Sequence, residues 1–394
     1  MAHIKKPFDV IVIGAGVIGS SIAYHLSRQK VKVLLLEKGD IAEGSSGACD
    51  GMVFLQSKKP GIHLQLALES RNQFAQIQEA LPYPIEYREC GGLVVIETQD
   101  EWIAMQHFVK EQQGAGLNVS LLTVDEVKEI EPHLSEHILG ATYSPLDGQV
   151  NPISLSLGFA LGAKALGSSL MINTSVYSID IVAGSGFVVE TQAGRFNASM
   201  IVNATGVYAP SIGAMVGVDI PIKPRRGQIL VTEKAPSILN HCMISAQYIA
   251  AKYNPEIAAG GCEGISIEQT ESGNLLLGST REFAGFDKRT TAGGLQRIAA
   301  NTTSLIPKLK QVNVIRSFAG LRPYTPDGMP ILGPVESVPG FYIAAGHEGD
   351  GVALAPITGE RIAKMIIDGK VPASLDCFGL DRFAPTDTIA EMNQ

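Results

Sequence analysis

One stretch decides the fold of this 394-residue chain: Val10-Ile-Val-Ile-Gly-Ala-Gly-Val-Ile-Gly19. The apolar run that leads into its first glycine has the length and β-branching of a buried parallel strand, so we expect a strand over 8–13 and a helix directly after it. The first glycine permits a tight turn, the second lets the backbone approach a pyrophosphate, and the third lets the helix pack closely on the strand. The free N–H groups at the start of that helix would face phosphate oxygens. The predicted phosphate-binding residues are Gly14, Ala15, Gly16, Val17, Ile18 and Gly19.

A glutamate after the next strand indicates the kind of dinucleotide. The apolar run 31–36 predicts a second buried strand, and Glu37 follows it at once, 18 residues beyond Gly19. That spacing is close to the one expected of the carboxylate that accepts hydrogen bonds from both hydroxyls of an adenosine ribose. The motif therefore favours an unphosphorylated ribose, as in FAD or NAD, over NADP. Lys38 is placed in the same nucleotide site.

The composition is that of a globular protein with a large core. Apolar residues make up 45% of the chain and charged residues 18%, and the length exceeds one typical domain, so two intertwined domains are expected. The formal charge of −8 and the pI of 5.6 argue against a surface for nucleic acid or anionic membrane. A short basic cluster, Lys223-Pro-Arg-Arg226, is interpreted as a solvated strand entrance.

The cysteines and the apolar runs predict no metal site, disulfide or membrane span. The five cysteines are scattered without a CxxC pair, so no disulfide framework, zinc site or iron-sulfur ligand set is encoded locally, and a reducing cytoplasmic location is the default. The first apolar run follows Lys5 and Lys6, but it is the dinucleotide strand and no cleavage site ends it, so we expect no export signal. The uncharged run 196–218 is interpreted as strand, loop and short helix rather than a membrane span.

The remaining pattern predicts helices and strands in alternation. Helical spacing predicts one long helix over 58–80, which prolines end, and further helices over 100–113, 123–130 and 151–166. Thr123-Val-Asp-Glu126 has the form of a capping box, and 145–148 is a predicted turn. Strands are expected at 91–97, 175–181, 187–191, 200–206, 228–232, 274–277 and 312–317. Because strand-like runs alternate with turns from 227 to 277, a mixed, mostly antiparallel sheet is expected there.

Five motifs taken together resemble one superfamily. They are Gly14-Ala-Gly-Val-Ile-Gly19 with Glu37, Gly44-Ser-Ser-Gly-Ala-Cys-Asp-Gly51, Asn203-Ala-Thr-Gly206, Gly320-Leu-Arg-Pro-Tyr-Thr-Pro-Asp-Gly328 and Gly346-His-Glu-Gly-Asp-Gly-Val-Ala-Leu-Ala-Pro356. Over nearly its whole length the chain resembles the D-amino-acid oxidase superfamily of FAD-dependent amine oxidoreductases, which includes glycine oxidase, sarcosine oxidase and D-amino-acid dehydrogenases. The segments 48–60 and 347–351 look most like the flavin subunits of bacterial proline, hydroxyproline and opine dehydrogenases, with the hydrogen cyanide synthase subunit nearby.

The resemblance implies an α/β fold with two domains. A Rossmann-like FAD-binding domain with a central parallel sheet would be discontinuous, over 1–85, 151–220 and 316–394. A substrate-binding domain with a mixed, mostly antiparallel sheet would take up 86–150 and 221–315, as in glycine oxidase. This arrangement brings both glycine-rich ends of the chain to one cofactor.

The resemblance also places residues around a non-covalent FAD. Ser45 and Ser46 would donate to phosphate oxygens, although either serine alone is also typical of a helix N-cap. Backbone N–H groups before a helix expected after Pro356 would meet the negative charge that develops at flavin N1 and O2 on reduction. No cysteine lies between Cys262 and Cys377, where monomeric sarcosine oxidase carries its flavin thioether, so a covalent link there is excluded. The other residues assigned to the FAD site are Gly47, Cys49, Asp50, Gly51, Met52, Val176, Ala204, Thr205, Gly206, Arg322, Gly349, Asp350, Gly351 and Val352.

Arg322 is the best single candidate for substrate binding. In the resemblance it matches the arginine that holds a substrate carboxylate, and a guanidinium can do so through two parallel charge-assisted bonds. The structural alternative is a salt bridge to Asp327. Tyr248 is a candidate second clamp or lid residue, and a plain core or surface tyrosine is an equal alternative.

Three further polar residues are placed near the flavin by their motifs. Asp50, His347 and Glu348 could hold a substrate amine or hydroxyl. His347 is equally readable as a satisfied loop histidine, and Glu348 as a solvent-facing residue. No essential base is required if the substrate binds with a neutral amine.

The expected function is an FAD-dependent dehydrogenase or oxidase that acts on a secondary or D-amino acid of proline, hydroxyproline or opine type. Hydride would pass from the carbon that bears nitrogen to flavin N5 and leave an imine. Electrons would go to O2, a quinone, or a partner flavin or iron-sulfur subunit, and an oligomer is expected. The alternatives are a stand-alone O2-using glycine or sarcosine oxidase and a non-catalytic flavin-holding scaffold subunit. Peripheral contact with the inner membrane through a partner is left open.

Overall fold

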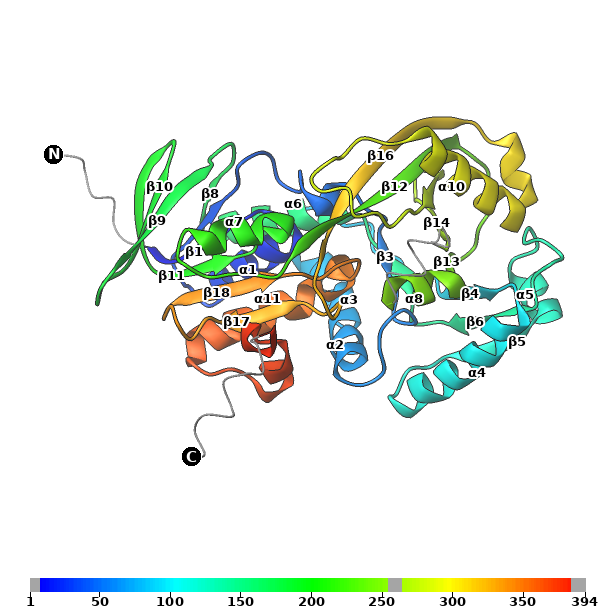
Figure 1. The fold of residues 1–394 in the computed structure, drawn as a ribbon, viewed down its shortest axis with the longest axis horizontal. Helices are drawn as coiled ribbons and strands as arrows, with labels where there is room; N and C mark the ends of the chain where they lie inside the picture. The colour runs from blue at the N-terminus through cyan, green and yellow to red at the C-terminus, as the bar shows by residue number, and fades with distance from the viewer. Residues whose placement is uncertain (1–7, 254–263, 384–394) are drawn as a thin grey trace.

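Two large sheets form the two ends of the molecule along its longest axis (Figure 1). The computed structural model describes residues 8–253 and 264–383. In that part of the chain each large sheet has eight strands, and a short ribbon pairs β3 (Met52–Val53) with β7 (Gly148–Gln149). The Lys5-Lys6 pair and Cys262, both used above, lie outside the described residues.

The first sheet has a parallel centre with antiparallel additions. Its strands are β1 (Phe8–Ile13), β2 (Val33–Leu36), β8 (Ser169–Met171), β9 (Val176–Val182), β10 (Gly186–Thr191), β11 (Gly194–Asn203), β17 (Ile331–Pro334) and β18 (Phe341–Ala345). Strands β18, β11, β1, β2 and β8 lie side by side in that order and run parallel. Strand β17 is antiparallel to β18, and β10 pairs antiparallel with both β11 and β9. The predicted Rossmann-like parallel sheet is confirmed.

Helices cover both faces of this sheet and explain why its strands are continuously apolar. The helices of the described residues are α1 (Val17–Arg28), α2 (Ile62–Arg71), α3 (Phe74–Ala80), α4 (Gln99–Gly114), α5 (Val124–Ile130), α6 (Pro152–Ala165), α7 (Ala209–Ala214), α8 (Ala246–Tyr253), α10 (Ala292–Leu305) and α11 (Gly351–Asp368), of which α4, α5, α8 and α10 pack against the second sheet. Val10 and Val12 of β1 pack in one apolar cluster with α1, α6 and α11. Ile11 and Ile13 point the other way, into a second cluster with α7. Strands buried on both faces are typical of parallel sheets.

Two glycines of the opening motif are required by the backbone. Gly14 has φ +103°, a conformation that residues with a Cβ rarely adopt. A Cβ on Gly19 would lie 1.9 Å from the carbonyl oxygen of Gly14, so only glycine lets α1 approach the strand this closely. The predicted packing role of Gly19 is confirmed.

The second sheet is mixed and mostly antiparallel, as predicted. Its strands are β4 (Gly92–Ile96), β5 (Ser120–Thr123), β6 (Gly140–Ser144), β12 (Lys223–Lys234), β13 (Cys242–Ser245), β14 (Ser266–Gln269), β15 (Asn274–Gly278) and β16 (Val314–Tyr324). Within these strands, β13 and β4 are the parallel pair. The long strands β12 and β16 pair along most of their length and reach from this sheet toward the first one (Figure 1).

Three expected elements differ in the structure. The single helix over 58–80 is wrong, because the chain turns at Asn72 and Gln73 and brings Phe74 into the core as a new helix. The last helix begins at Gly351, before Pro356 rather than after it. Arg322 lies within β16, whereas the sequence predicted a strand that ends before it.

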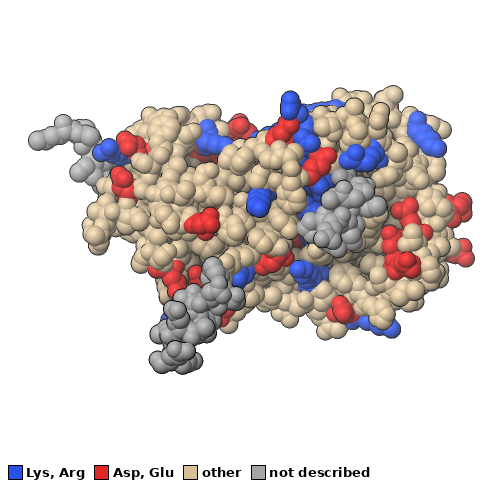
Figure 2. Space-filling model, in the orientation of Figure 1, with Lys and Arg blue, Asp and Glu red and all other residues tan. Residues whose placement is uncertain are grey.

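The uncharged run 196–218 folds as predicted, with β11 followed by the short 3-10 helix η2 (Gly206–Tyr208) and α7. Further 3-10 turns are η1 (Ser45–Gly47), η3 (Pro307–Gln311), η4 (Ala373–Phe378) and η5 (Leu380–Phe383). Among the helices that the structure describes, none has the length and apolar character needed to cross a membrane. On the face shown in Figure 2, basic side chains lie scattered among acidic ones rather than in one continuous patch.

Candidate active site

A cavity of about 420 Å³ lies where the first sheet meets β12 and β16 of the second sheet. Most residues predicted for the site line it: Gly14, Gly16, Val17, Ile18, Glu37, Lys38, Ser45, Ser46, Cys49, Asp50, Met52, Val176, Ala204, Thr205, Gly206, Tyr248, Arg322, His347, Gly349, Gly351 and Val352. Those that do not line it are Ala15, Gly19, Gly47, Gly51 and Asp350. The two glycine-rich ends of the chain therefore meet at one cavity.

The first turn and the N-terminus of α1 form one end of the cavity. Glu37 accepts a hydrogen bond from the Ala15 N–H at 2.8 Å and another from the Gly39 N–H at 2.9 Å, so it ties the first turn to the end of β2. The Val17 N–H donates to the Ser46 hydroxyl at 3.0 Å. A helix N-terminus that opens onto a cavity beside two glycines fits the pyrophosphate of a dinucleotide.

The N-terminus of α11 forms the opposite wall. Gly349, Gly351 and Val352 line the cavity there, and the first turn of this 18-residue helix carries no acidic side chain. The Gly349 N–H at this end donates to the Glu348 carboxylate, and Asp350 is the N-cap residue of the helix. Ser45 has a different role from the predicted phosphate donor, because its hydroxyl donates to the Leu321 carbonyl and fixes the loop against β16.

The Arg322 side chain also lines the cavity. Its Nη1 donates to the Thr280 carbonyl at 3.0 Å and its Nη2 to the Ser279 hydroxyl at 2.8 Å. The alternative salt bridge to Asp327 is not formed, because Asp327 pairs with Arg382 at 2.8 Å. The guanidinium is thus held in place by neutral hydrogen-bond acceptors, and its charge also acts on the nearby carboxylates of Asp50 and Glu348.

Gly349 locates the space that Arg322 faces. A Cβ on Gly349 would lie 3.8 Å from the Tyr248 hydroxyl and 3.9 Å from Arg322 Nε. The phenol and the guanidinium therefore border the same small volume beside α11. Tyr248 is buried on α8, so the surface-tyrosine alternative is wrong.

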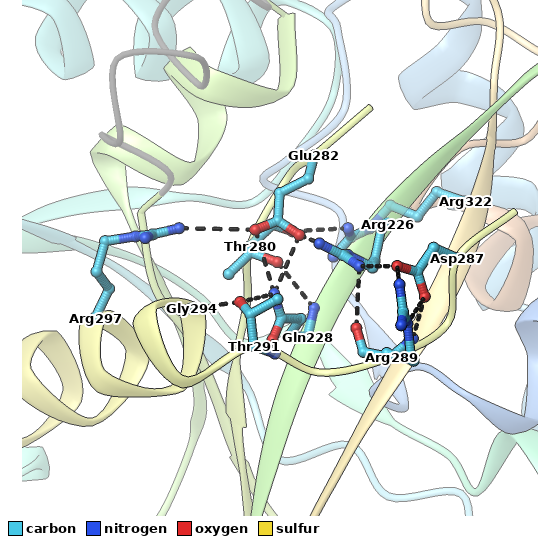
Figure 3. Close-up of polar contacts among 10 residues, drawn as sticks. All are labelled: Arg226, Gln228, Thr280, Glu282, Asp287, Arg289, Thr291, Gly294, Arg297 and Arg322. Carbon is cyan, nitrogen blue, oxygen red and sulfur yellow. Dashed lines mark hydrogen bonds and ion pairs between the residues drawn. The ribbon is translucent and has the colours of Figure 1, made fainter. Parts of the chain in front are cut away.

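A polar network behind Arg322 holds the segment that positions it (Figure 3). The Gln228 N–H donates to the Thr280 hydroxyl at 3.0 Å, and the Gln228 side chain contacts Glu282 and Thr291. Arg226 Nε donates to Glu282 at 2.6 Å. The interpretation of the 223–226 cluster as solvated is wrong, because Arg226 is buried here as a partner of Glu282 and its neighbour Arg225 is fully buried.

Glu348 is buried at the cavity wall, which contradicts the solvent-facing interpretation. Its Oε1 lies 2.7 Å from Arg281 Nη1 and 3.6 Å from Arg225 Nη1. Burial alone would raise the pKa of the Glu348 carboxyl, but Arg281 and the neighbouring cations outweigh it and hold that pKa below its usual value. The residue also has φ +49°, a strained backbone conformation that persists where the surroundings demand it.

Asp350 faces away from the cavity into a buried cationic cluster. Lys58 and Lys252 each approach its carboxylate to 2.7 Å, and His63 Nε2 lies 3.3 Å from it. Although burial opposes ionisation, Lys252 and Lys58 hold the pKa of Asp350 well below its usual range. The Asp350 side chain therefore has a structural role, and its backbone N–H, which was expected to face the flavin with those of its neighbours, donates to the His347 carbonyl at 2.8 Å.

His347 lines the cavity as a neutral residue. Its Nε2 lies 3.2 Å from the Thr358 hydroxyl on α11. Burial lowers the pKa of His347 to about 3, so the imidazole carries no charge at neutral pH. The satisfied-loop interpretation fits this contact.

Asp50 lines the cavity near Arg322, and a second carboxylate lies behind it. The Ser266 hydroxyl donates to Asp50 at 3.4 Å, and the Gly51 N–H donates to Glu268 at 2.8 Å. Sequence reasoning missed Glu268, Arg281 and Arg225. The signal for Glu268 was the alternation of polar residues on a strand otherwise buried, whereas the two arginines carry no local motif.

The thiols give no support for a metal or a covalent cofactor link. Cys49, Cys90, Cys242 and Cys377 are free, and of these Cys49 lines the cavity. Over residues 8–253 and 264–383 no group of three His, Cys, Asp or Glu side chains is arranged to hold a metal ion.

The fold and the cavity fit a dinucleotide-dependent oxidoreductase. Residues 9–365 match the family described as "DAO: FAD dependent oxidoreductase", and the chain belongs to this family. It is therefore an FAD-dependent oxidoreductase, and the residues that line the cavity fit that cofactor.

Several relatives match this chain over nearly its whole length. A glycine oxidase of Geobacillus kaustophilus is 32% identical over 95% of this chain and 97% of that protein. Its crystal structure superposes with a TM-score of 0.87 at 30% identity, over 96% of this chain and 100% of that one. Hydrogen cyanide synthase subunit HcnC of Pseudomonas protegens is 29% identical over 96% of this chain and 97% of that protein. The structure of an L-proline dehydrogenase from P. horikoshii has a TM-score of 0.87 at 27% identity, over 96% of this chain and 98% of that one.

Proposed function

We propose that the protein oxidises the carbon–nitrogen bond of an amino acid, a secondary or D-configured amine of proline, hydroxyproline or opine type, to an imine. The observation that carries the proposal is Arg322, a cationic fork held by Ser279 and Thr280 at the cavity. A carboxylate bound to it would lie between Tyr248 and the N-terminus of α11. Relatives named for glycine and proline support an amino acid substrate.

Different residues of the chain would bind the cofactor and the substrate at this site. Gly14, Gly16 and the start of α1 would hold the pyrophosphate, and the α11 N-terminus would face the flavin pyrimidine. When bound, FAD supplies the acceptor for a hydride at N5. Arg322 fixes the substrate carboxylate and Tyr248 restricts its rotation, so the carbon that bears nitrogen is aimed at that acceptor.

The electron acceptor distinguishes the two enzymatic candidates. A glycine oxidase among the relatives favours a stand-alone enzyme that uses O2. HcnC is named as a subunit, which favours a dehydrogenase that passes electrons to a partner flavin or iron-sulfur subunit or to a quinone. The buried charges around Arg322 argue against a non-catalytic scaffold, because a scaffold needs no cationic fork in its cavity.

Anaerobic bleaching of the FAD-loaded protein tests the proposal. The panel contains D- and L-proline, hydroxyproline isomers, glycine, sarcosine, D-alanine and an opine. We expect bleaching by at least one cyclic or secondary amino acid and its loss in Arg322→Met. Rapid recovery in air would identify an oxidase and slow recovery a dehydrogenase, whereas an unchanged response of Arg322→Met would refute the carboxylate clamp.

A further inference from the structure

Two carboxylates, those of Asp50 and Glu268, lie close together at the loop that leads to the cavity. Ser266 and Glu268 are two residues apart on β14, so their side chains leave the same face of the strand. Ser266 donates to the Asp50 carboxylate at 3.4 Å, and Glu268 accepts the Gly51 N–H at 2.8 Å. The strand therefore holds two consecutive residues of the loop and brings Glu268 beside Asp50.

The two carboxylates have unlike surroundings. Asp50 lines the cavity, whereas Glu268 is 3% exposed and lies behind it. Glu268 Oε2 is buried and has no hydrogen-bond partner among the described residues. An ionised carboxylate with a bare buried oxygen is costly, and a proton on that oxygen removes the cost. A proton is therefore bound more favourably by Glu268 than by Asp50, and the negative charge is carried more favourably by Asp50.

The charges that face the pair support this division. Burial and then the charge of Asp50 raise the pKa of Glu268 to about 8, while Cys90 adds to the rise and Arg88 opposes it. Burial also raises the pKa of Asp50, and Arg322 is the main opposing charge, with Arg281 next. At neutral pH the pair therefore holds a proton on Glu268.

Arg322 links this pair to substrate binding. A substrate carboxylate on Arg322 would offset the main charge that opposes the rise in the pKa of Asp50. The affinity of Asp50 for a proton would then rise when an amino acid enters, at the moment when the ammonium group of that amino acid arrives in the cavity. A free amino acid binds mostly as the ammonium form at neutral pH, and only the neutral amine can give up a hydride.

We propose that Asp50 accepts the proton of the substrate ammonium and that Glu268 is the positioning residue that sets the proton affinity of Asp50. The inference rests on the proposed function. In the step, an N–H bond breaks, its electron pair stays on nitrogen, and an O–H bond forms on Asp50. The pair goes from one proton to two, and no electron changes hands. The neutral amine is then oxidised by loss of hydride to FAD.

Glu268→Gln separates this role from a structural one. The amide oxygen of glutamine still accepts the Gly51 N–H, but the side chain no longer titrates. The measurement is the rate constant of anaerobic flavin reduction against pH, with a saturating substrate from the panel. We expect an inflection from Glu268 in the pH profile of the unmodified protein and its loss in Glu268→Gln. Asp50→Asn should slow reduction at pH 7 by about 100-fold or more, with recovery at alkaline pH where the free amine is already neutral.

Two control measurements distinguish the possible outcomes. Glu268→Ala should weaken FAD binding, because Gly51 loses its acceptor, whereas Glu268→Gln should not. An infrared titration of the FAD-loaded protein without substrate should show a protonated carboxyl signal that disappears near pH 8 and is absent in Glu268→Gln. An unchanged pH profile and infrared signal in Glu268→Gln, or reduction at the normal rate in Asp50→Asn, would overturn the inference. Failure of every amino acid to bleach FAD at any pH would instead refute the proposed function, while the infrared titration still decides whether the pair holds a proton.

Discussion

Gly227→Ala tests the carboxylate clamp without removing a functional group. A Cβ at this position of β12 would lie 2.1 Å from Arg322 Nη1 and 2.6 Å from its Cζ. Ordinary contact begins near 3.4 Å, so the guanidinium must move by about 1 Å. That shift misaligns the bonds to Ser279 and Thr280 and the fork that would meet a carboxylate. Loss of one charge-assisted bond of about 1.5–3 kcal/mol raises the Kd of a carboxylate about ten- to 100-fold.

The assay is a titration of the FAD-loaded protein with acetate, followed by the flavin absorption spectrum. Gly293→Ala on α10 is the matched control, because its new Cβ would meet only Arg297 Nη1 at 3.8 Å. We expect FAD affinity to stay within about twofold in both variants. An acetate Kd in Gly227→Ala equal to that of Gly293→Ala would show that Arg322 does not bind the carboxylate.

Three further predictions concern carboxylates that hold the site together. Glu37→Ala removes the acceptor of the Ala15 and Gly39 N–H groups and should weaken FAD binding about tenfold or more by calorimetry, and unchanged binding would refute the role of Glu37. Glu348→Gln leaves Arg281 and Arg225 buried without a counter-charge and should lower the free energy of unfolding by about 3–5 kcal/mol, while the exposed control Glu336→Gln should stay within about 0.5 kcal/mol. Asp350→Asn should destabilise by a similar amount at pH 7. Because the folded pKa of Asp350 is depressed, this stabilisation is present above the unfolded pKa of about 4 and is lost as the pH falls through the folded value, so the difference from the unmodified protein in denaturant titrations should shrink below about pH 4.

The parts of the fold that the sequence predicts are those with local causes. Gly14 is required by its own positive φ, and Gly19 by its contact with the Gly14 carbonyl five residues earlier. The Thr123 capping box forms as expected because both its hydrogen bonds lie within four residues. The parallel and antiparallel sheets follow from continuous and interrupted apolar runs. The break at Asn72 was not predictable from helical spacing, because it serves the packing of Phe74 in the core.

Site residues that belong to a sequence motif were predictable. Site residues whose role depends on charged partners distant in the sequence were not. Arg322 lines the cavity within a recognisable motif. Glu348 looked solvent-facing because a lone glutamate in a loop usually is, and only the fold shows that Arg281 and Arg225 surround it. Glu268 belongs to no motif, and its proximity to the loop at Asp50 arises from the pairing of β14 in the second sheet.

Two carboxylates in the loop before α11, those of Glu348 and Asp350, form ion pairs with other elements of the site. Glu348 binds Arg225 of β12 and Arg281 in the loop after β15. Asp350 binds Lys252 of α8, the helix that carries Tyr248. The helix end that faces the cavity is therefore tied by buried ion pairs to the elements that carry the substrate-facing groups. Because removal of one partner of a buried pair is costly, the distance between the α11 N-terminus and Tyr248 is held more tightly than apolar packing alone would hold it. An enzyme that transfers hydride over a fixed short distance requires such a restraint, and here charge provides it.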